Sequence, residues 1–288
     1  MSFNEITVAP EAHGFGAKIT GVDLTRAMPS SVLAEVRAAW ARHSVVYFPD
    51  QDLDNLALEA FSRQIGPFGD NPYVEAMVDH PNILEVRREA NEVATNFGAG
   101  WHSDWSFQEN PPSATILLSK VTPPVGGDTH YADCARAYEA LSDVMKNILA
   151  GLYTRHSAAV SYGSQGFFAK DDTPRTMNII STTKADESLR HPLVRRHPEN
   201  GRDVLFINHT YTVAIEGMHS DESKALLSFL YDHITKDEFI YKHRWQRNML
   251  VMWDNRSVLH SAQGGYDGYQ RIMHRTVVAG EKPILATA

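Results

Sequence analysis

Hydrophobic residues recur with two different spacings in the first hundred positions. Residues 30–43 and 53–65 carry apolar side chains three and four positions apart, which predicts two amphipathic helices. The β-branched and aromatic run 44–48 is typical of a buried strand, and 14–24 and 82–86 each contain a shorter one. Strands and helices therefore alternate in this part of the chain.

Strands become more frequent after residue 113. Two helical patterns interrupt them, at 134–149 and 221–234. Many short strands, few helices and turns rich in Gly and Pro are typical of an antiparallel sandwich or barrel with helices packed outside. The strand candidates are the runs SATILLS, DTHYA, DVLFIN, EFIYKHRW, MLVMWD, SVLHSA and RIMHRTVVAG.

The stretch 160–190 has the weakest periodicity. It is long and polar, and a loop of this length inside a compact domain is often a functional lid or is disordered. The sequence contains no repeat, no low-complexity segment and no linker. We therefore expect residues 1–288 to form a single domain.

The composition excludes several classes of protein. Of 288 residues 43% are hydrophobic, enough for a sizeable core, and the formal net charge of −8 argues against a nucleic-acid binder. Because Cys134 is the only cysteine, neither an intrachain disulfide nor a cysteine-rich zinc site is possible. The sequence shows no signal peptide and no apolar run of membrane-spanning length. We expect a soluble, cytoplasmic protein that has no membrane partner and binds anions through local cationic clusters.

The tripeptide His-Ser-Asp occurs twice, and its context separates the two copies. Residues 219–221 directly precede an apolar-periodic run, where Ser220 and Asp221 are suited to cap a helix. His102 and Asp104 lie in GWHSDWSF, and in an extended segment residues i and i+2 point to the same side. A converging imidazole and carboxylate suit Fe(II), which two histidines and one carboxylate commonly hold.

A third ligand must come from a distant histidine. His260 is the best candidate, because it follows a strand and a tight turn in MLVMWDNRSVLHSA, at the mouth of an expected hairpin. Periodicity alone does not exclude four others, His130, His156, His209 and His243.

Two arginines follow His260 on one predicted strand. Arg271 and Arg275 lie in RIMHRTVVAG, and strand alternation places them on the same face as Met273. Two buried arginines on one face are costly unless they bind anions, whereas an exposed strand would leave both solvated. The apolar residues around them favour the anion-binding alternative.

These features together resemble the TauD/TfdA family of Fe(II)- and 2-oxoglutarate-dependent dioxygenases. The resemblance covers nearly the whole chain, through GFGAKITGVDL, SVVYFPDQDL, PPVGGDT and VMWDNRSVLHSA. It implies a mainly β fold with flanking helices around a double-stranded β-helix, or jelly-roll, core. Segments 87–92 and 222–233 look more like the aryloxyalkanoate-cleaving members than the taurine enzymes.

The resemblance also implies roles for individual residues. His102, Asp104 and His260 would bind Fe(II). Thr129 would hydrogen-bond a carboxylate of 2-oxoglutarate, and Arg271 would pair with its distal carboxylate through a planar fork of donors. Within the same resemblance, the hairpin that aims the third ligand would be built by Trp253 and Asn255.

On the substrate side, the resemblance assigns Arg275 to the anionic group of the substrate. Asn71 and Tyr73 lie in the segment where relatives contact substrate. Taurine enzymes have an asparagine four residues before the first histidine ligand, and Gly98 stands there in this chain. Aromatic surface for an apolar tail is available from Trp105, Phe107, Phe167 and Phe168.

The activity that this implies is hydroxylation of a small anionic organic substrate with O2, giving succinate and CO2. Hydroxylation beside an ether oxygen or a sulfonate sulfur would let the product collapse with bond cleavage. Alternatives are a taurine or alkylsulfonate dioxygenase, a metal-dependent hydrolase on a similar barrel in which zinc activates water, and a non-catalytic binding barrel. We also expect a homo-oligomer.

Overall fold

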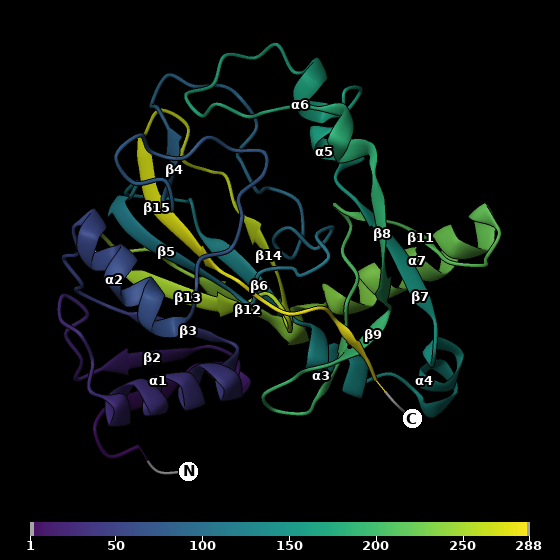
Figure 1. Cartoon of the computed structure of the whole chain (residues 1–288), viewed down its shortest axis with the longest axis horizontal. Helices are drawn as coiled ribbons and strands as arrows, with labels where there is room; N and C mark the ends of the chain where they lie inside the picture. The colour runs from purple at the N-terminus through teal and green to yellow at the C-terminus, as the bar shows by residue number, and fades with distance from the viewer. Residues whose placement is uncertain (1–2, 287–288) are drawn as a thin grey trace.

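The computed structural model describes residues 3–286, and its largest sheet has seven strands in the order β1-β2-β3-β13-β5-β15-β4 (Figure 1). Neighbouring strands are antiparallel except for β2 and β3, which run parallel. The bounds are β1 Thr7–Pro10, β2 Ala17–Thr20, β3 Val45–Phe48, β4 Leu84–Arg88, β5 Ala114–Val121, β13 Leu250–Asp254 and β15 Arg271–Val278.

A smaller sheet packs against the inner face of the large one. It consists of β12 (Ile240–His243), β6 (Thr129–Asp133) and β14 (Val258–Ala262), all antiparallel. A buried cluster joins the two sheets, with Tyr131 and Val258 from the small sheet meeting side chains of β5, β13 and β15. The predicted mainly β jelly-roll core is confirmed, although the sheets stay open and do not close into a barrel.

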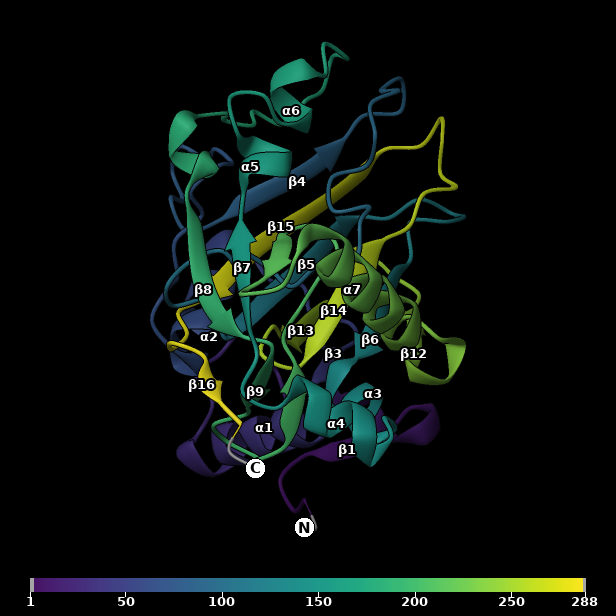
Figure 2. The ribbon, with the colours of Figure 1, turned by 90° about the vertical axis from the view of Figure 1, so that its right-hand side faces the viewer.

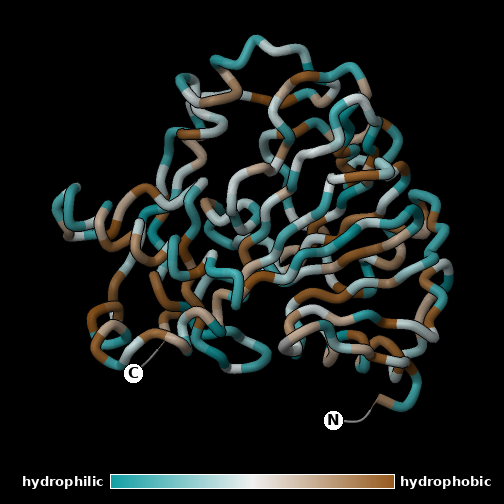
Figure 3. The backbone as a smooth tube through the Cα atoms, turned by 180° about the vertical axis from the view of Figure 1, so that it is seen from behind, coloured by the Kyte–Doolittle hydropathy of each residue, from teal (hydrophilic) through white to brown (hydrophobic). Residues whose placement is uncertain are grey.

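Strand alternation explains how β13 serves two cores. Leu250 and Met252 point outward and are fully buried under the helices, whereas Val251 and Trp253 point inward to the space between the sheets. Because successive strand side chains face opposite ways, an apolar run without polar interruption is what a strand covered on both faces requires. Hydrophobic stretches accordingly follow the stacked strands in Figure 3.

Helices α1 (Ser30–His43) and α2 (Asn55–Ile65) cover the outer face of the large sheet, as the sequence pattern predicts (Figure 1). The single helix predicted over 134–149 is wrong. The chain forms α3 (Cys134–Glu139) and α4 (Asp143–Leu149), because the hydroxyl of Ser142 accepts a hydrogen bond from the N–H of Met145 and starts a new helix.

The remaining elements pack around one side of the small sheet and above the large one (Figure 2). Two further sheets have the orders β11-β7-β8 and β10-β9-β16. Their strands are β7 Tyr153–Ser157, β8 Ser188–Pro192, β9 Val194–Arg196, β10 Asp203–Leu205, β11 Thr212–Ile215 and β16 Ile284–Leu285. The other helices are α5 Ala159–Tyr162, α6 Phe167–Lys170, α7 Ser220–Ile234 and the 3-10 turns Ala12–Gly14, Thr183–Asp186 and Asp237–Phe239.

The weakly periodic stretch 160–190 is structured rather than featureless. It contains α6 and a 3-10 turn, and it lies over the end of the sheets near β4 and β15 (Figures 1 and 2). Tyr162, Phe168, Met177 and Ile179 anchor it in a hydrophobic cluster. Its periodicity is weak because its elements are too short to repeat a pattern. Within residues 3–286, no helix combines the length and the apolar character needed to cross a bilayer.

Candidate active site

Three side chains converge between the two sheets. His102, Asp104 and His260 are buried, and their potential ligand atoms lie within 4.8 Å of one another. Oδ1 of Asp104 is 3.5 Å from Nε2 of His102 and 3.8 Å from Nε2 of His260. Two imidazoles and a carboxylate form a donor set for a divalent transition metal and leave other coordination positions open. The structure thus brings together the three residues that the sequence singled out.

The main chain holds the two histidines side by side. The N–H of His102 donates to the carbonyl of His260 at 3.0 Å, and the N–H of His260 donates back at 2.8 Å. The expected hairpin is wrong, because β13 pairs with β3 and β5 whereas β14 pairs with β6. Residues 255–257 therefore carry the chain from the large sheet to the small one. This crossing places His260 on the strand β14, where it pairs with His102.

The segment that carries His102 and Asp104 is not a strand either. Only His102 forms a bridge, and the chain turns from Asp104 onward, with Trp105 in the left-handed region at φ 46°. The convergence of His102 and Asp104 therefore comes from a turn, and strand alternation is not its cause.

Hydrogen bonds fix the orientation of two of the three side chains. Nδ1 of His102 lies 2.7 Å from the carbonyl of Gly100, so the ring donates there and its Nε2 lone pair faces Asp104. Oδ2 of Asp104 accepts a 2.6 Å bond from the hydroxyl of Thr115, which in turn accepts from Nδ2 of Asn255 at 2.9 Å. Nδ1 of His260 is buried without a hydrogen-bond partner in the described chain.

Charge in the site favours the forms that bind a metal. Burial acts to raise the pKa of Asp104, but the guanidinium of Arg275 and the two imidazoles hold it well below its usual value. Burial lowers the pKa of His260 well below its usual value, and the neighbouring His102 adds to this. A carboxylate and a neutral imidazole are the protonation states that a metal ion needs.

Two arginines of β15 line the cavity above the triad. This cavity measures about 50 Å³ and is bounded by Val86, Phe97, Gly98, His102, Asp104, Leu117, Thr129, Trp253, His260, Ala262, Arg271 and Arg275. Arg275 places Nη2 2.9 Å from Oδ1 of Asp104 and its guanidinium 5.2 Å from the ring centre of Trp105. Both arginines are buried, so the alternative of a solvated, exposed strand is wrong.

Arg271 differs from Arg275 in having no acidic partner. Its side chain is buried, its Nε has no hydrogen bond to a described residue, and Asp128 contributes a favourable charge without forming an ion pair with it in the described chain. Thr129 shares the cavity, and its hydroxyl accepts a 3.0 Å bond from Nε1 of Trp245. An unpaired, buried guanidinium beside a hydroxyl is an incomplete anion site.

Comparison with known proteins identifies the family. The model of the family described as "Taurine catabolism dioxygenase TauD, TfdA family" matches residues 7–277. The chain belongs to this family.

Proteins similar to this chain match it over most of its length. An alpha-ketoglutarate-dependent 2,4-dichlorophenoxyacetate dioxygenase of Cupriavidus pinatubonensis is 35% identical, over 85% of this chain and 88% of that protein. An alpha-ketoglutarate-dependent sulfate ester dioxygenase of Pseudomonas putida is 31% identical, over 97% of this chain and 91% of that protein. The crystal structure of AAD-2 in complex with Mn(II) and N-oxalylglycine matches at 29% identity and a TM-score of 0.79, covering 98% and 100% of the two chains. The chain is therefore a 2-oxoglutarate-dependent dioxygenase whose His-Asp-His group could hold a metal ion, and the hydrolase and binding-barrel alternatives are rejected.

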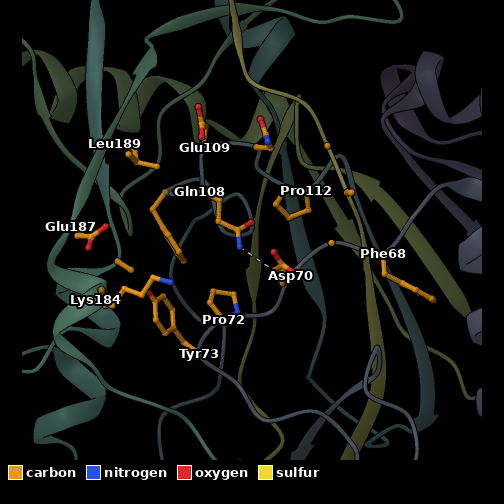
Figure 4. A pocket seen from close by; sticks show the side chains of 17 residues that line it. Phe68, Asp70, Pro72, Tyr73, Gln108, Glu109, Pro112, Lys184, Glu187 and Leu189 are labelled. Carbon is orange, nitrogen blue, oxygen red and sulfur yellow. Dashed lines mark hydrogen bonds between the residues drawn. The ribbon is translucent and has the colours of Figure 1, made fainter.

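In this TauD/TfdA enzyme, an aromatic wall closes one side of the site. Asn71 accepts a 3.1 Å bond from Nε1 of Trp105, and Tyr73 stacks on Tyr162 with ring centres 4.9 Å apart. Figure 4 shows Tyr73 among the side chains of a separate surface pocket of about 500 Å³. Asn71 and Tyr73 thus lie behind the wall, whereas Trp105 reaches Arg275.

Two tyrosines of this wall were not singled out in the sequence. Tyr162 and Tyr211 are buried, their hydroxyls interact with each other, and Tyr211 packs edge-on against His102 with ring centres 6.2 Å apart. They come from segments without a recognisable motif, so only the fold reveals them. Phe168 packs on Tyr162, whereas Phe167 is 47% exposed and packs edge-on against Phe168 with ring centres 5.1 Å apart.

The second His-Ser-Asp copy lies outside the site. His219 precedes α7, and its N–H donates to Oε2 of Glu222 at 2.9 Å, which satisfies a free amide at the helix start. The helix begins at Ser220, so the capping position belongs to His219, one residue before the predicted one.

Proposed function

We propose that this enzyme uses Fe(II), 2-oxoglutarate and O2 to hydroxylate a small anionic organic substrate, an aryloxyalkanoate-like carboxylate above others. One observation carries the proposal: two buried arginines of one strand face a His-Asp-His triad, and one of them lacks a carboxylate partner among the described residues. Because buried arginines need counter-charges, such a site is suited to bind two anions next to a metal, namely the co-substrate and the substrate.

The donor set supports Fe(II). His102 and His260 offer neutral nitrogen ligands and Asp104 offers an ionised oxygen ligand, a mixture that suits Fe(II) in oxygenases. When bound, the iron supplies with 2-oxoglutarate and O2 the oxidising power that converts C–H to C–OH, while 2-oxoglutarate becomes succinate and CO2. The chain contributes position, charge and shielding from water.

Arg271 and Thr129 would hold the co-substrate. The planar guanidinium of Arg271 matches the two oxygens of a distal carboxylate, and Thr129 adds a hydroxyl on the same side of the cavity. Gly127 allows the loop before Thr129 to approach Arg271 closely. Its φ of 71° favours glycine, and a Cβ at this position would stand 3.4 Å from Arg271.

Arg275 would bind the anionic group of the substrate. It pairs with Asp104 at 2.9 Å, and a cation held by the triad would take up that carboxylate charge. Arg275 would then be buried without a counter-charge, which a substrate carboxylate supplies. This places the carbon that is oxidised within a few bonds of the acid.

The aromatic wall favours an apolar tail on that acid. Trp105, Tyr162 and Tyr211 offer ring faces and buried hydroxyls next to Arg275, and we assign Asn71 and Tyr73 the task of holding this wall in place as part of the substrate site. Hydroxylation beside the ether oxygen of an aryloxy acid gives a hemiacetal, which collapses with C–O cleavage. The relative that acts on 2,4-dichlorophenoxyacetate supports this choice.

A sulfonate or sulfate ester is the second candidate substrate. The relative from Pseudomonas putida supports it, since that protein is a sulfate ester dioxygenase. A Cβ added at Gly98 would stand 3.4 Å from His102, so this position lies beside the site. Gly98 has no side-chain amide to bind a substrate, whereas taurine enzymes carry an asparagine here, and we therefore rank taurine below larger acids.

The deciding experiment measures succinate formed from 2-oxoglutarate with Fe(II) and ascorbate. The panel contains aryloxy acids, alkyl sulfates, alkylsulfonates including taurine, and neutral analogues. We expect succinate and a phenol from an aryloxy acid. Turnover of a neutral analogue at an equal rate contradicts the proposal, and turnover of sulfates alone favours the second candidate.

We also propose that residues 1–288 act as one catalytic domain within a homo-oligomer. In support of one domain, strands from both ends of the described chain, β1 to β4 and β13 to β15, share the large sheet. Light scattering combined with limited proteolysis tests both points.

A further inference from the structure

A second arginine stands directly opposite Arg271 in the sheet. Strands β4 and β15 are antiparallel, and their register pairs Arg88 with Arg271. Cross-strand partners lie on the same face, and like charges in that position are destabilising. The two guanidinium groups therefore repel each other unless an anion lies between them.

The contacts of Arg88 leave part of its guanidinium unused. Its side chain is 11% exposed, and Nη2 bonds to Asp267 at 3.0 Å, a carboxylate that is itself 89% exposed. Nε of Arg88 is buried without a hydrogen-bond partner, as is Nε of Arg271. Tyr266 lies under the guanidinium of Arg88 at 5.0 Å and interacts with both arginines.

Both arginines line one small cavity next to the catalytic one. The two cavities share Val86, Phe97, Ala262 and Arg271 in their walls. The outer one adds Arg175 from the 160–190 segment, whose guanidinium pairs with Asp171, and one carboxylate, Glu92. Glu92 is occupied by the N–H and hydroxyl of Thr176 at 3.2 and 3.0 Å. Four arginines, Arg87, Arg88, Arg175 and Arg271, thus outnumber the carboxylates in the wall of the outer cavity, in a protein whose net charge is negative.

We infer that Arg88 is a second cation of the co-substrate site, so that Arg88 and Arg271 together bind the distal carboxylate of a C4 or C5 dicarboxylate such as 2-oxoglutarate or succinate. The inference rests on the proposed role of Arg271. Two guanidinium groups on one carboxylate satisfy both unpartnered nitrogens and remove the repulsion across the strands. Arg88 binds and does not take part in the chemistry.

Isothermal titration calorimetry with 2-oxoglutarate on the Mn(II)-loaded chain tests this without turnover. Arg88→Gln should weaken binding by roughly tenfold, the value of one lost hydrogen bond to a charged group. The control is Arg190→Gln on β8, because that arginine pairs with Glu216 and lines neither of the two cavities. Arg190→Gln should leave the affinity unchanged, and equal affinity of both variants and wild type overturns the inference.

A surface variant covers the case in which Arg88→Gln does not fold. Asp267→Asn removes the exposed partner of Arg88 and should tighten 2-oxoglutarate binding by roughly twofold to fivefold, the range of a surface ion pair. Unchanged affinity overturns the inference. If the succinate assay fails with every substrate while binding still depends on Arg88, the proposed reaction is wrong and the second cation stands.

Discussion

Thr115 donates a 2.6 Å hydrogen bond to Oδ2 of Asp104, the carboxylate oxygen that is not nearest to the imidazoles. The bond leaves Oδ1 for a metal and fixes the plane of the carboxylate. Thr115→Val should lower metal affinity by roughly tenfold or more, as other lost supports of metal ligands do. Isothermal titration calorimetry with the metal ion measures this affinity. Thr115→Ser keeps the hydroxyl and should bind like wild type, and equal weakening in both would assign the effect to packing.

The two His-Ser-Asp copies give a matched pair of variants. His102→Ala should abolish tight iron binding, because it removes one of three ligands, whereas His219→Ala should leave it unchanged. Iron content after dialysis against a weak chelator measures both. Equal loss of iron in the two variants would overturn the assignment of the triad.

Arg271→Ala should weaken 2-oxoglutarate binding by roughly 2–4 kcal/mol, since it leaves a buried carboxylate without its main partner. Titration of the Mn(II)-loaded variant gives the affinity. Arg244→Ala is the control, because that arginine is 90% exposed. Wild-type affinity in Arg271→Ala would mean that another cation holds the carboxylate.

Arg275→Leu should reduce turnover of an anionic substrate by roughly a hundredfold, the cost of leaving a buried anion unpaired. Binding of 2-oxoglutarate should persist, because Arg271 is untouched. Steady-state rates and calorimetry on one preparation separate the two effects. Fast turnover of the acid by the variant would show that another residue binds the anionic group of the substrate.

The metal-free chain should lose stability as pH falls below the unfolded-state histidine pKa of about 6.5. Burial lowers the pKa of His191 to about 4 and that of His243 to about 3, so the unfolded chain takes up protons that the folded chain refuses. His191 alone accounts for roughly 3 kcal/mol between about pH 6.5 and about pH 4.

Urea unfolding of the metal-free chain at about pH 7.5 and about pH 5 checks the sign of this dependence. His191→Gln should reduce the loss of unfolding free energy between the two pH values. The surface variant His219→Gln should show the same loss as wild type. A free energy of unfolding that rises on acidification would contradict the direction of both shifts.

Local patterns predicted much of the fold because they report local causes. The periodicity of α1, the apolar run of β13 and the periodicity of α7 each depend on residues within one element. The break at Ser142 also has a local cause, but its hydroxyl competes with a helical pattern that continues past it.

Pairing between distant strands could not be predicted in the same way. Nothing in MLVMWDNRSVLHSA shows that β13 and β14 enter different sheets, because the turn alone fits either outcome. Tyr162 and Tyr211 meet only through the packed cluster, and Arg88 becomes relevant only through its register with Arg271. The sequence singled out the candidate ligands and the two arginines, while the neighbours that orient them needed the structure.

The bridge between His102 and His260 places the proposed metal site where two distant segments of the chain meet. One ligand pair belongs to a turn beside the large sheet and the third ligand to the small sheet, far along the chain. An ion held there binds the folded chain and has no comparable site in the unfolded one, so it stabilises the folded state by mass action. Separation of the two sheets would therefore release the ion, and removal of the ion should lower the free energy of unfolding of a chain that still folds without it.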